Sequence, residues 1–498
     1  MSDRSISAIP SRLLGRLAAA AALLWLAAGA AAANELPDFG TPADAVMSKS
    51  REYQIGRQVM LQLHNAGAIL EDPELTEYIT SIGSRIASHA SDGRTRFSFF
   101  IVNEPEINAF AMPGGFIGVN TGLILASENE NELAGVLAHE ISHVTQRHIA
   151  RSVYENQRTS VVSMAAMLAA ILLGAATDMG GDAITGVVTA SQAMALQRQI
   201  NYTRSNEFEA DRIGMELLSA SGFDPNGMAS FFEKLGRRYG TSSQYVPALL
   251  QTHPLSSERV AESRARARQL PQVQNESSIA YGLAKTRLQV LNAQSPEAAM
   301  ALYRGRMDST DPTDRYGLAL ASMRIGLADN AERLFRELAA EFPNVIAFRI
   351  GQAEALLASG LTEAAFDAYR EFVRLFPRNV PLTISYASAL LDAGEAATAH
   401  RVLLDLLNNV PATPAQLRLI ARAANAEGDV GNSHFYMSYY YTAIGDLQLA
   451  LHQLRLALEA PGVHTVDRAR FEARRDQLIE YLPDELRERE AARRPGQP

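Results

Sequence analysis

Two histidines and a glutamate occur at a spacing that can bind and use a metal ion. The motif is His139-Glu140-Ile141-Ser142-His143, and its histidines are four residues apart. Positions i and i+4 share one face of an α-helix, so both imidazoles can reach one metal. Glu140 follows the first histidine and projects beside the metal, where it can take a proton from a bound water. The pattern predicts a hydrolytic site with one zinc ion per chain.

A catalytic zinc site also needs a third protein ligand and an open position for water. The best source of that ligand is the stretch from Glu207 to Asp211, which falls on a predicted helix. Glu207 can bind the metal, while Asp211, one turn on, hydrogen-bonds the free nitrogen of a ligating imidazole. Glu209 points to another face, and we expect it not to be a ligand. The alternative is a solvated helix start whose carboxylates meet the helix dipole.

Two further histidines need an interpretation. His253 precedes Pro254 in a loop whose backbone the proline restricts. It can stabilise the oxyanion of the reaction, occupy the open zinc position in a latent resting state, or cap the next helix. His148 is five residues after His143 and would face about 140° away from it on an ideal helix. We therefore expect His148 to be structural.

Short strands are predicted just before the metal motif. Residues 96–103 contain an apolar run, and residues 108–125 read as strand, Pro-Gly-Gly turn, strand. The second strand of this hairpin is a candidate edge on which an extended substrate adds by backbone pairing. Its candidate substrate-binding residues are Phe116, Gly118, Val119 and Asn120.

The C-terminal half contains an internal repeat. Gly326, Gly360, Gly394 and Gly428 are each 34 residues apart, and alanines recur in the same register. Stacked helical hairpins require a glycine at the turn and a small residue where two helices cross. The period resembles that of the tetratricopeptide repeat, whose concave surface we expect to serve partners or substrate.

Composition and the N-terminal segment indicate a compartment. Residues 1–33 carry arginines, then an apolar core, then small residues, which is typical of a secretory signal peptide. An uncleaved signal anchor is the alternative. The chain has no cysteine and a formal net charge of −9, which argues against disulfides, thiol catalysis and a main role in nucleic-acid binding. We expect a periplasmic protein.

These observations predict an α+β zinc metallopeptidase domain, mostly helical with a small sheet, followed by an all-α solenoid. The expected division is a signal peptide at 1–33, the metallopeptidase domain at 34–270, a partial helical hairpin or connector at 271–313, repeats at 314–483 and a charged tail at 484–498. An apolar run at 161–176 is too short to span a bilayer, so we expect the 161–196 segment to be buried or to cover the active site.

The pairing of the His139–His143 motif with Glu207-Phe208-Glu209-Ala210-Asp211 resembles the zinc endopeptidase family of the CAAX prenyl endopeptidase and the heat-shock membrane protease. The resemblance implies zinc ligation by His139, His143 and Glu207. It favours the branch of the family without spanning helices, and implies quality control of outer-membrane proteins.

The expected substrates are unfolded or misassembled envelope proteins, and the expected repeat partner is the machinery that assembles outer-membrane barrels. Peripheral contact with a membrane is compatible with this role. The proposed catalytic residues are Glu140, Asp211 and His253. The competing interpretation is a chaperone-like assembly factor whose peptidase site is latent, blocked by His253 or by the 161–196 segment. A scaffold with a purely structural zinc would want four protein ligands and no water.

Overall fold

The structure is a computed structural model, and it describes residues 47–90, 95–156, 204–239 and 246–480, apart from 272, 274, 275 and 307, together with residues 482 and 487. The expected signal peptide, the 161–196 segment and most of the charged tail lie outside the described residues. Within the part that the structure describes, no helix combines the length and apolarity needed to cross a bilayer.

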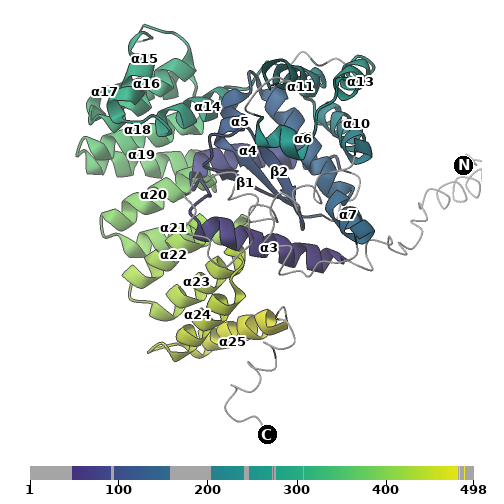
Figure 1. The fold of residues 1–498 in the computed structure, drawn as a ribbon. Coiled ribbons are helices and arrows are strands. Elements are labelled where there is room, and N and C mark those ends of the chain that lie inside the picture. Colours follow the sequence, from purple (N-terminus) through teal and green to yellow (C-terminus); the bar gives the residue numbers. More distant parts are fainter. Residues whose placement is uncertain are drawn as a thin grey trace, which may run out of the picture.

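The N-terminal half surrounds a three-stranded sheet with helices (Figure 1). Its strands are β1 (Ser98–Val102), β2 (Ala109–Met112) and β3 (Phe116–Asn120), and the Pro-Gly-Gly turn joins β2 to β3 as predicted. The helices are α3 (Lys49–Asn65), α4 (Pro73–Ala87), α5 (Thr121–Ala126), α6 (Glu130–Thr145), α7 (His148–Asn156), α10 (Arg204–Ala220), α11 (Asn226–Tyr239), α12 (Ala248–Thr252) and α13 (Ser257–Ala267).

The strand order is β1-β3-β2, which corrects one prediction. We expected the strand with Phe116, Gly118, Val119 and Asn120 to be an edge, but β3 pairs in parallel with β1 and antiparallel with β2. Both of its backbone sides are therefore used, and it cannot accept an added strand. The sequence could not show this order, because the β1–β3 pairing joins segments separated along the chain. Among the described residues, β2 pairs on one side only.

The C-terminal half is a series of antiparallel helices. After α14 (Ile279–Leu291) and α15 (Pro296–Arg304), the pairs follow one another at the 34-residue period. The four repeated glycines, Gly326, Gly360, Gly394 and Gly428, have φ values of +77° to +89°, which an L side chain rarely adopts. The α+β domain followed by a helical solenoid is confirmed. The remaining helices are α16 (Pro312–Arg324), α17 (Ala328–Glu341), α18 (Ile346–Ala358), α19 (Thr362–Leu375), α20 (Val380–Asp392), α21 (Ala396–Asn409), α22 (Pro414–Ala426), α23 (Val430–Ile444), α24 (Leu447–Glu459) and α25 (Thr465–Glu480).

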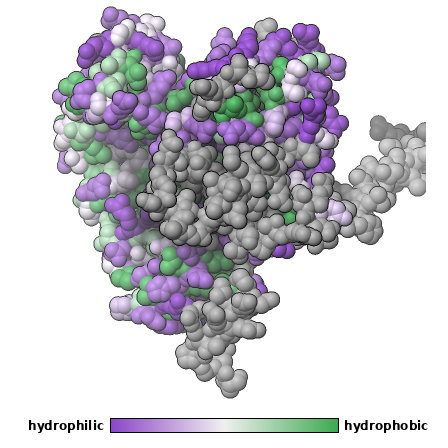
Figure 2. All heavy atoms as spheres, in the orientation of Figure 1, coloured by the Kyte–Doolittle hydropathy of each residue, from purple (hydrophilic) through white to green (hydrophobic). Residues whose placement is uncertain are grey.

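The helical arc curves around the N-terminal half, with α3, α4 and the sheet on its inner side (Figure 1). Helix α4 contacts α14 and α20, and α3 contacts α23. Polar contacts tie the same surfaces together: Arg287 lies 2.8 Å from Asp72, and His64 Nε2 lies 2.7 Å from the Tyr440 hydroxyl. The inner surface that we expected to serve partners is thus at least partly covered by the chain's own N-terminal half. Figure 2 shows that polar and apolar residues interleave on the side of the repeats that faces the viewer.

Candidate metal centre

Helix α6 presents both histidines of the motif to one point. Its first turn is capped by Asn129, whose side chain accepts a hydrogen bond from the Glu132 amide. His139 and His143 follow on the same face, each 2% exposed, with their Nε2 atoms 2.9 Å apart. The helix is buried on almost every side, which explains its apolar surroundings in the sequence.

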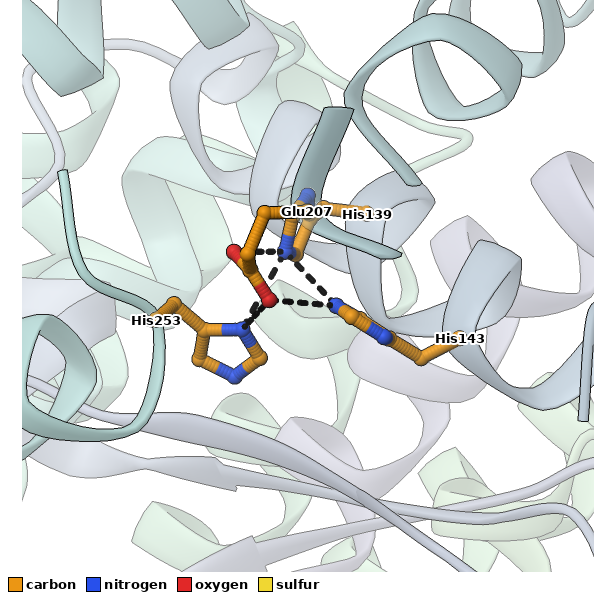
Figure 3. Close-up of side chains that lie close together, drawn as sticks. All are labelled: His139, His143, Glu207 and His253. Atoms are coloured by element: carbon orange, nitrogen blue, oxygen red, sulfur yellow. Dashed lines mark hydrogen bonds and ion pairs between the residues drawn. The ribbon is translucent and has the colours of Figure 1, made fainter. Parts of the chain in front are cut away.

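Helix α10 brings the carboxylate to the two imidazoles (Figure 3). Gly214 packs against the backbone of Ala138, so the two helices approach closely. Glu207 Oε2 then lies 3.5 Å from His139 Nε2, and its Oε1 lies 3.4 Å from His143 Nε2. Two imidazole nitrogens and one carboxylate therefore converge from helices that are separated by more than fifty residues of sequence.

The donor set fits a zinc ion. His139 Nδ1 lies 2.9 Å from Asp211 Oδ1, so this nitrogen carries the proton and Nε2 presents its lone pair to the centre. The Nε2 atoms of both imidazoles and the carboxylate of Glu207 face one point, and a cation bound there would be contacted by all three. Nitrogen and carboxylate ligands of this number suit zinc. Glu140 is fully buried, and its Oε1 lies 3.5 Å from His253 Nε2, so this carboxylate belongs to the same cluster and is placed to act as a base.

Asp211 is itself held by a buried arginine, which the sequence did not single out. Arg259, 1% exposed, donates to both oxygens of Asp211 at 2.8 Å and lies 2.7 Å from Glu207 Oε2. Burial alone would raise the pKa of Asp211, but the hydrogen bonds from Arg259 and His139 outweigh it and lower that pKa. Asp211 therefore stays ionised and fixes the orientation of His139.

His148 lies beside the centre and not on the opposite side of the helix, which contradicts the expected direction. Helix α6 ends at Thr145, and Arg147 adopts a left-handed φ of +53° that turns the chain back. His148 Nδ1 then lies 2.8 Å from His143 Nδ1, and its Nε2 lies 3.1 Å from Glu209. A left-handed conformation cannot be recognised from an arginine, so no signal in the sequence revealed this arrangement.

The charge state of His148 assigns the direction of these hydrogen bonds. Burial lowers the pKa of His148 to about 4, although Glu209 partly opposes this shift. A neutral ring that donates from Nε2 to Glu209 accepts at Nδ1, so His143 Nδ1–H is the donor. His148 and Glu209 thus hold the proton of His143 away from the metal-facing nitrogen, as Asp211 does for His139.

The loop histidine belongs to the same cluster. His253 Nδ1 lies 3.0 Å from Glu207 Oε1 and 3.3 Å from His139 Nε2, while its Nε2 lies 3.5 Å from Glu140. The candidate ligand atoms of His139, His143, Glu207 and His253 all lie within 4.8 Å of one another. A fourth donor, the third nitrogen of the cluster, therefore lies in the region in which a catalytic site keeps its water.

Comparison with known proteins places this geometry in a family. The model of peptidase family M48 matches residues 73–267. The chain is 40% identical over 315 residues to a putative beta-barrel assembly-enhancing protease of Vibrio cholerae and 39% identical over 317 residues to the beta-barrel assembly-enhancing protease of Escherichia coli. Each alignment covers 62% of this chain and 64% of the relative, just under two thirds of its length.

Structural comparison finds helical-repeat proteins, among them yeast Tom70, with a TM-score of 0.28 and 12% identity over 75% of this chain and 85% of that one. The family match covers α4 to α13, and so includes the metal motif, Glu207, Asp211 and His253. Residues 73–267 form a peptidase family M48 domain.

Proposed function

We propose that the chain is a zinc endopeptidase that degrades unfolded or misassembled proteins of the bacterial envelope in the periplasm. The observation that carries the proposal is the buried meeting of His139, His143 and Glu207 beside the buried carboxylate of Glu140. The relatives named for beta-barrel assembly support a client that is an outer-membrane protein.

The residues have distinct roles in hydrolysis. Zinc, when bound, acidifies a water and polarises the scissile carbonyl. Glu140 accepts the proton of that water and passes it to the leaving amine. Burial raises the pKa of Glu140, partly opposed by the neighbouring His253 and His139, and a raised pKa suits a group that must both accept and donate. Asp211 and His148 keep the two imidazoles oriented.

Substrate binding is assigned to β2 in place of β3. Helix α6 packs against β2. The backbone of Ala111 in β2 is close enough to Glu140 to lower the pKa of that carboxyl, so this strand lies beside the reacting groups. An extended peptide can add to the side of β2 that has no strand partner in the described chain. A peptide N-methylated at alternate amides should be cut far more slowly than its parent, and equal rates would remove this assignment.

Cleavage of an unfolded protein tests the function. Zinc-loaded chain should degrade casein, whereas Glu140→Gln should bind zinc equally and degrade casein about 10²- to 10⁴-fold more slowly. Zinc content measured by chelator titration separates loss of the base from loss of the metal. Zinc binding without any cleavage by the parent chain would contradict an active peptidase.

A second candidate function, a chaperone-like assembly factor with a latent site, is favoured by the position of His253. Its Nδ1 lies 3.0 Å from Glu207, so it can act as a fourth ligand and exclude the water. His253→Ala should raise casein cleavage if the histidine blocks the metal, and lower it if the histidine stabilises the oxyanion. An unchanged rate would remove both roles. Docking of the repeats on the barrel assembly machinery is the partner interaction that we propose for either function.

A further inference from the structure

A cavity of about 620 Å³ lies directly beside the metal centre. His143 and Met112 line its inner side, and Pro113 and Gly114 of the β2–β3 turn line the next part of its wall. The outer wall comes from the repeat half, through residues of α23, α24 and α25 such as Thr442. The cavity therefore joins the end of β2 to the last repeats.

The charged residues of this wall are mostly basic. Among the described residues of the wall, five are cations and one is a carboxylate, Glu52, although the whole chain has a net charge of −9. Glu52 already lies 3.4 Å from Arg147, so it is engaged with one of the cations. The cations are Lys49, Arg57, Arg96, Arg147 and Arg474. Such a concentration of one sign in a concave, partly enclosed space attracts anions.

Arg57 is the least expected of these cations. It is 8% exposed, and it donates from Nη2 to the carbonyl of Thr442 at 2.9 Å. Among the described residues, its Nε has no hydrogen-bond partner and no carboxylate forms an ion pair with its guanidinium. Burial and the nearby Arg474 lower the pKa of Arg57, opposed in part by Tyr53. A buried guanidinium without a carboxylate is costly, and an anion delivered by a ligand would offset that cost.

A peptide bound along β2 would extend into the cavity. Ala111 lies beside Glu140, and the cavity begins with Ala111 and Met112 and continues along the turn. A strand advances about 3.3 Å per residue, so a peptide paired with β2 reaches the cavity about two to four residues from its scissile bond. Antiparallel pairing would place residues before the scissile bond there, and parallel pairing would place residues after it.

We propose that this cavity is a specificity site that binds a carboxylate of the peptide substrate through Arg57, Arg96 and Arg474. The proposal rests on the proposed peptidase function and adds a substrate class to it, namely peptides that carry an acidic group a few residues from the cleaved bond. The carboxylate comes from an aspartate or glutamate side chain or from a free C-terminus. An acidic residue in this position binds more tightly than its uncharged amide because its carboxylate forms charge-assisted hydrogen bonds with the guanidinium groups.

The test measures binding separately from cleavage. Labelled peptides rich in Val and Thr, which favour strands, carry a single Asp or the matched Asn at successive positions, with a free or an amidated C-terminus. Fluorescence anisotropy gives their affinities for the zinc-loaded, full-length Glu140→Gln chain. At low salt, one Asp position or the free C-terminus should bind about tenfold more tightly than its uncharged partner. The position that responds identifies the source of the carboxylate.

Charge-neutralising variants then locate the site. Arg57→Gln and Arg96→Gln, each added to Glu140→Gln, should abolish most of the preference, and Arg96 is exposed enough to change without disturbing the fold. Arg238→Gln, an exposed cation on α11, is the matched control and should keep the preference.

The outcomes separate this inference from the proposed function. Equal affinities for every Asp and Asn pair, or no binding by any peptide, overturn the carboxylate site. A preference that survives both cavity variants overturns its location. A preference that both variants remove, in a parent chain that cuts neither casein nor any peptide, would retain the site and contradict the peptidase.

Discussion

The metal centre and the repeats are built on opposite principles. At the metal centre, residues of different types meet at one point, because the candidate ligand atoms of His139, His143, Glu207 and His253 all lie within 4.8 Å of one another. In the repeats, the same residue type recurs every 34 positions and each copy packs in the same way. Substitutions at the centre should therefore remove chemistry, whereas substitutions in the repeats should change stability by modest amounts.

The largest expected effect is at the third ligand. Glu207→Gln removes the negative charge that balances the metal, so zinc affinity and casein cleavage should both fall by about a thousandfold or more. Zinc titration and a cleavage assay measure the two losses. Glu216→Gln, an exposed position on the same helix, is the control. Full activity of Glu207→Gln would show that the centre does not depend on this carboxylate.

A smaller effect on zinc affinity is expected for the residues that hydrogen-bond the candidate ligand His143. His148→Ala and Glu209→Gln leave the ligands in place but release the proton-bearing side of His143, so zinc affinity should fall about 10- to 100-fold. Competition with a chelator measures the affinity, and the exposed His89→Ala is the control. A lowered Tm with unchanged zinc affinity would mean that His148 only packs, as the sequence suggested.

The contact between the halves should respond to pH. Burial raises the pKa of Glu74 to about 7. Arg287, 2.7 Å away, opposes this rise, whereas the negative charge of Asp72, which contacts the same arginine, adds to it. The folded state then holds a proton that the unfolded state has lost, so stability decreases as the pH rises from about 4.5 through 7. The decrease amounts to about 2 kcal/mol between pH 5 and pH 7.

Glu74→Gln should remove this dependence, which urea unfolding of zinc-loaded protein at the two pH values measures. The difference between the parent and Glu74→Gln should be smallest near pH 5 and should favour the variant at pH 7. Glu363→Gln, on the exposed first turn of α19, should track the parent at both values. A constant difference between parent and Glu74→Gln would contradict the raised pKa.

The smallest effect belongs to the repeats. Gly360 has a φ of +77° and no atom within 4 Å of an added Cβ, so Gly360→Ala should cost about 1 kcal/mol through backbone strain alone. Gly305 is equally open but has a φ of −79°. Gly305→Ala should therefore stabilise the chain by about 0.5 kcal/mol. Urea unfolding compares the two, and equal signs would show that φ is not what selects glycine in the repeats.

Features with a local cause could be predicted from the sequence. The zinc motif depends on four-residue spacing, the repeats on a fixed period, and the hairpin on its Pro-Gly-Gly turn, so each is visible within a short window. The fold class and the family follow from such features. The placement of Glu207 beside the two histidines could also be predicted, because Glu207 and Asp211 are one helical turn apart and both contact His139.

Features that depend on the packing of distant segments could not be predicted. The central position of β3 results from pairing with β1, and the direction of His148 results from the left-handed Arg147. Arg259 donates a hydrogen bond to Asp211 from 48 residues away in the sequence, and no pattern near either residue predicts the contact. The division into domains, the role of the 161–196 segment and the signal peptide stay predictions.

The contact of the repeats with the N-terminal half has a mechanical consequence. In a free solenoid, each repeat contacts only its neighbouring repeats, so no distant contact fixes the curvature. Here the arc is fastened near both ends, by α14 against α4 and by α23 against α3. Its curvature is therefore set by the N-terminal half, and a partner that straightened it would displace α3 and the cavity wall beside the metal centre.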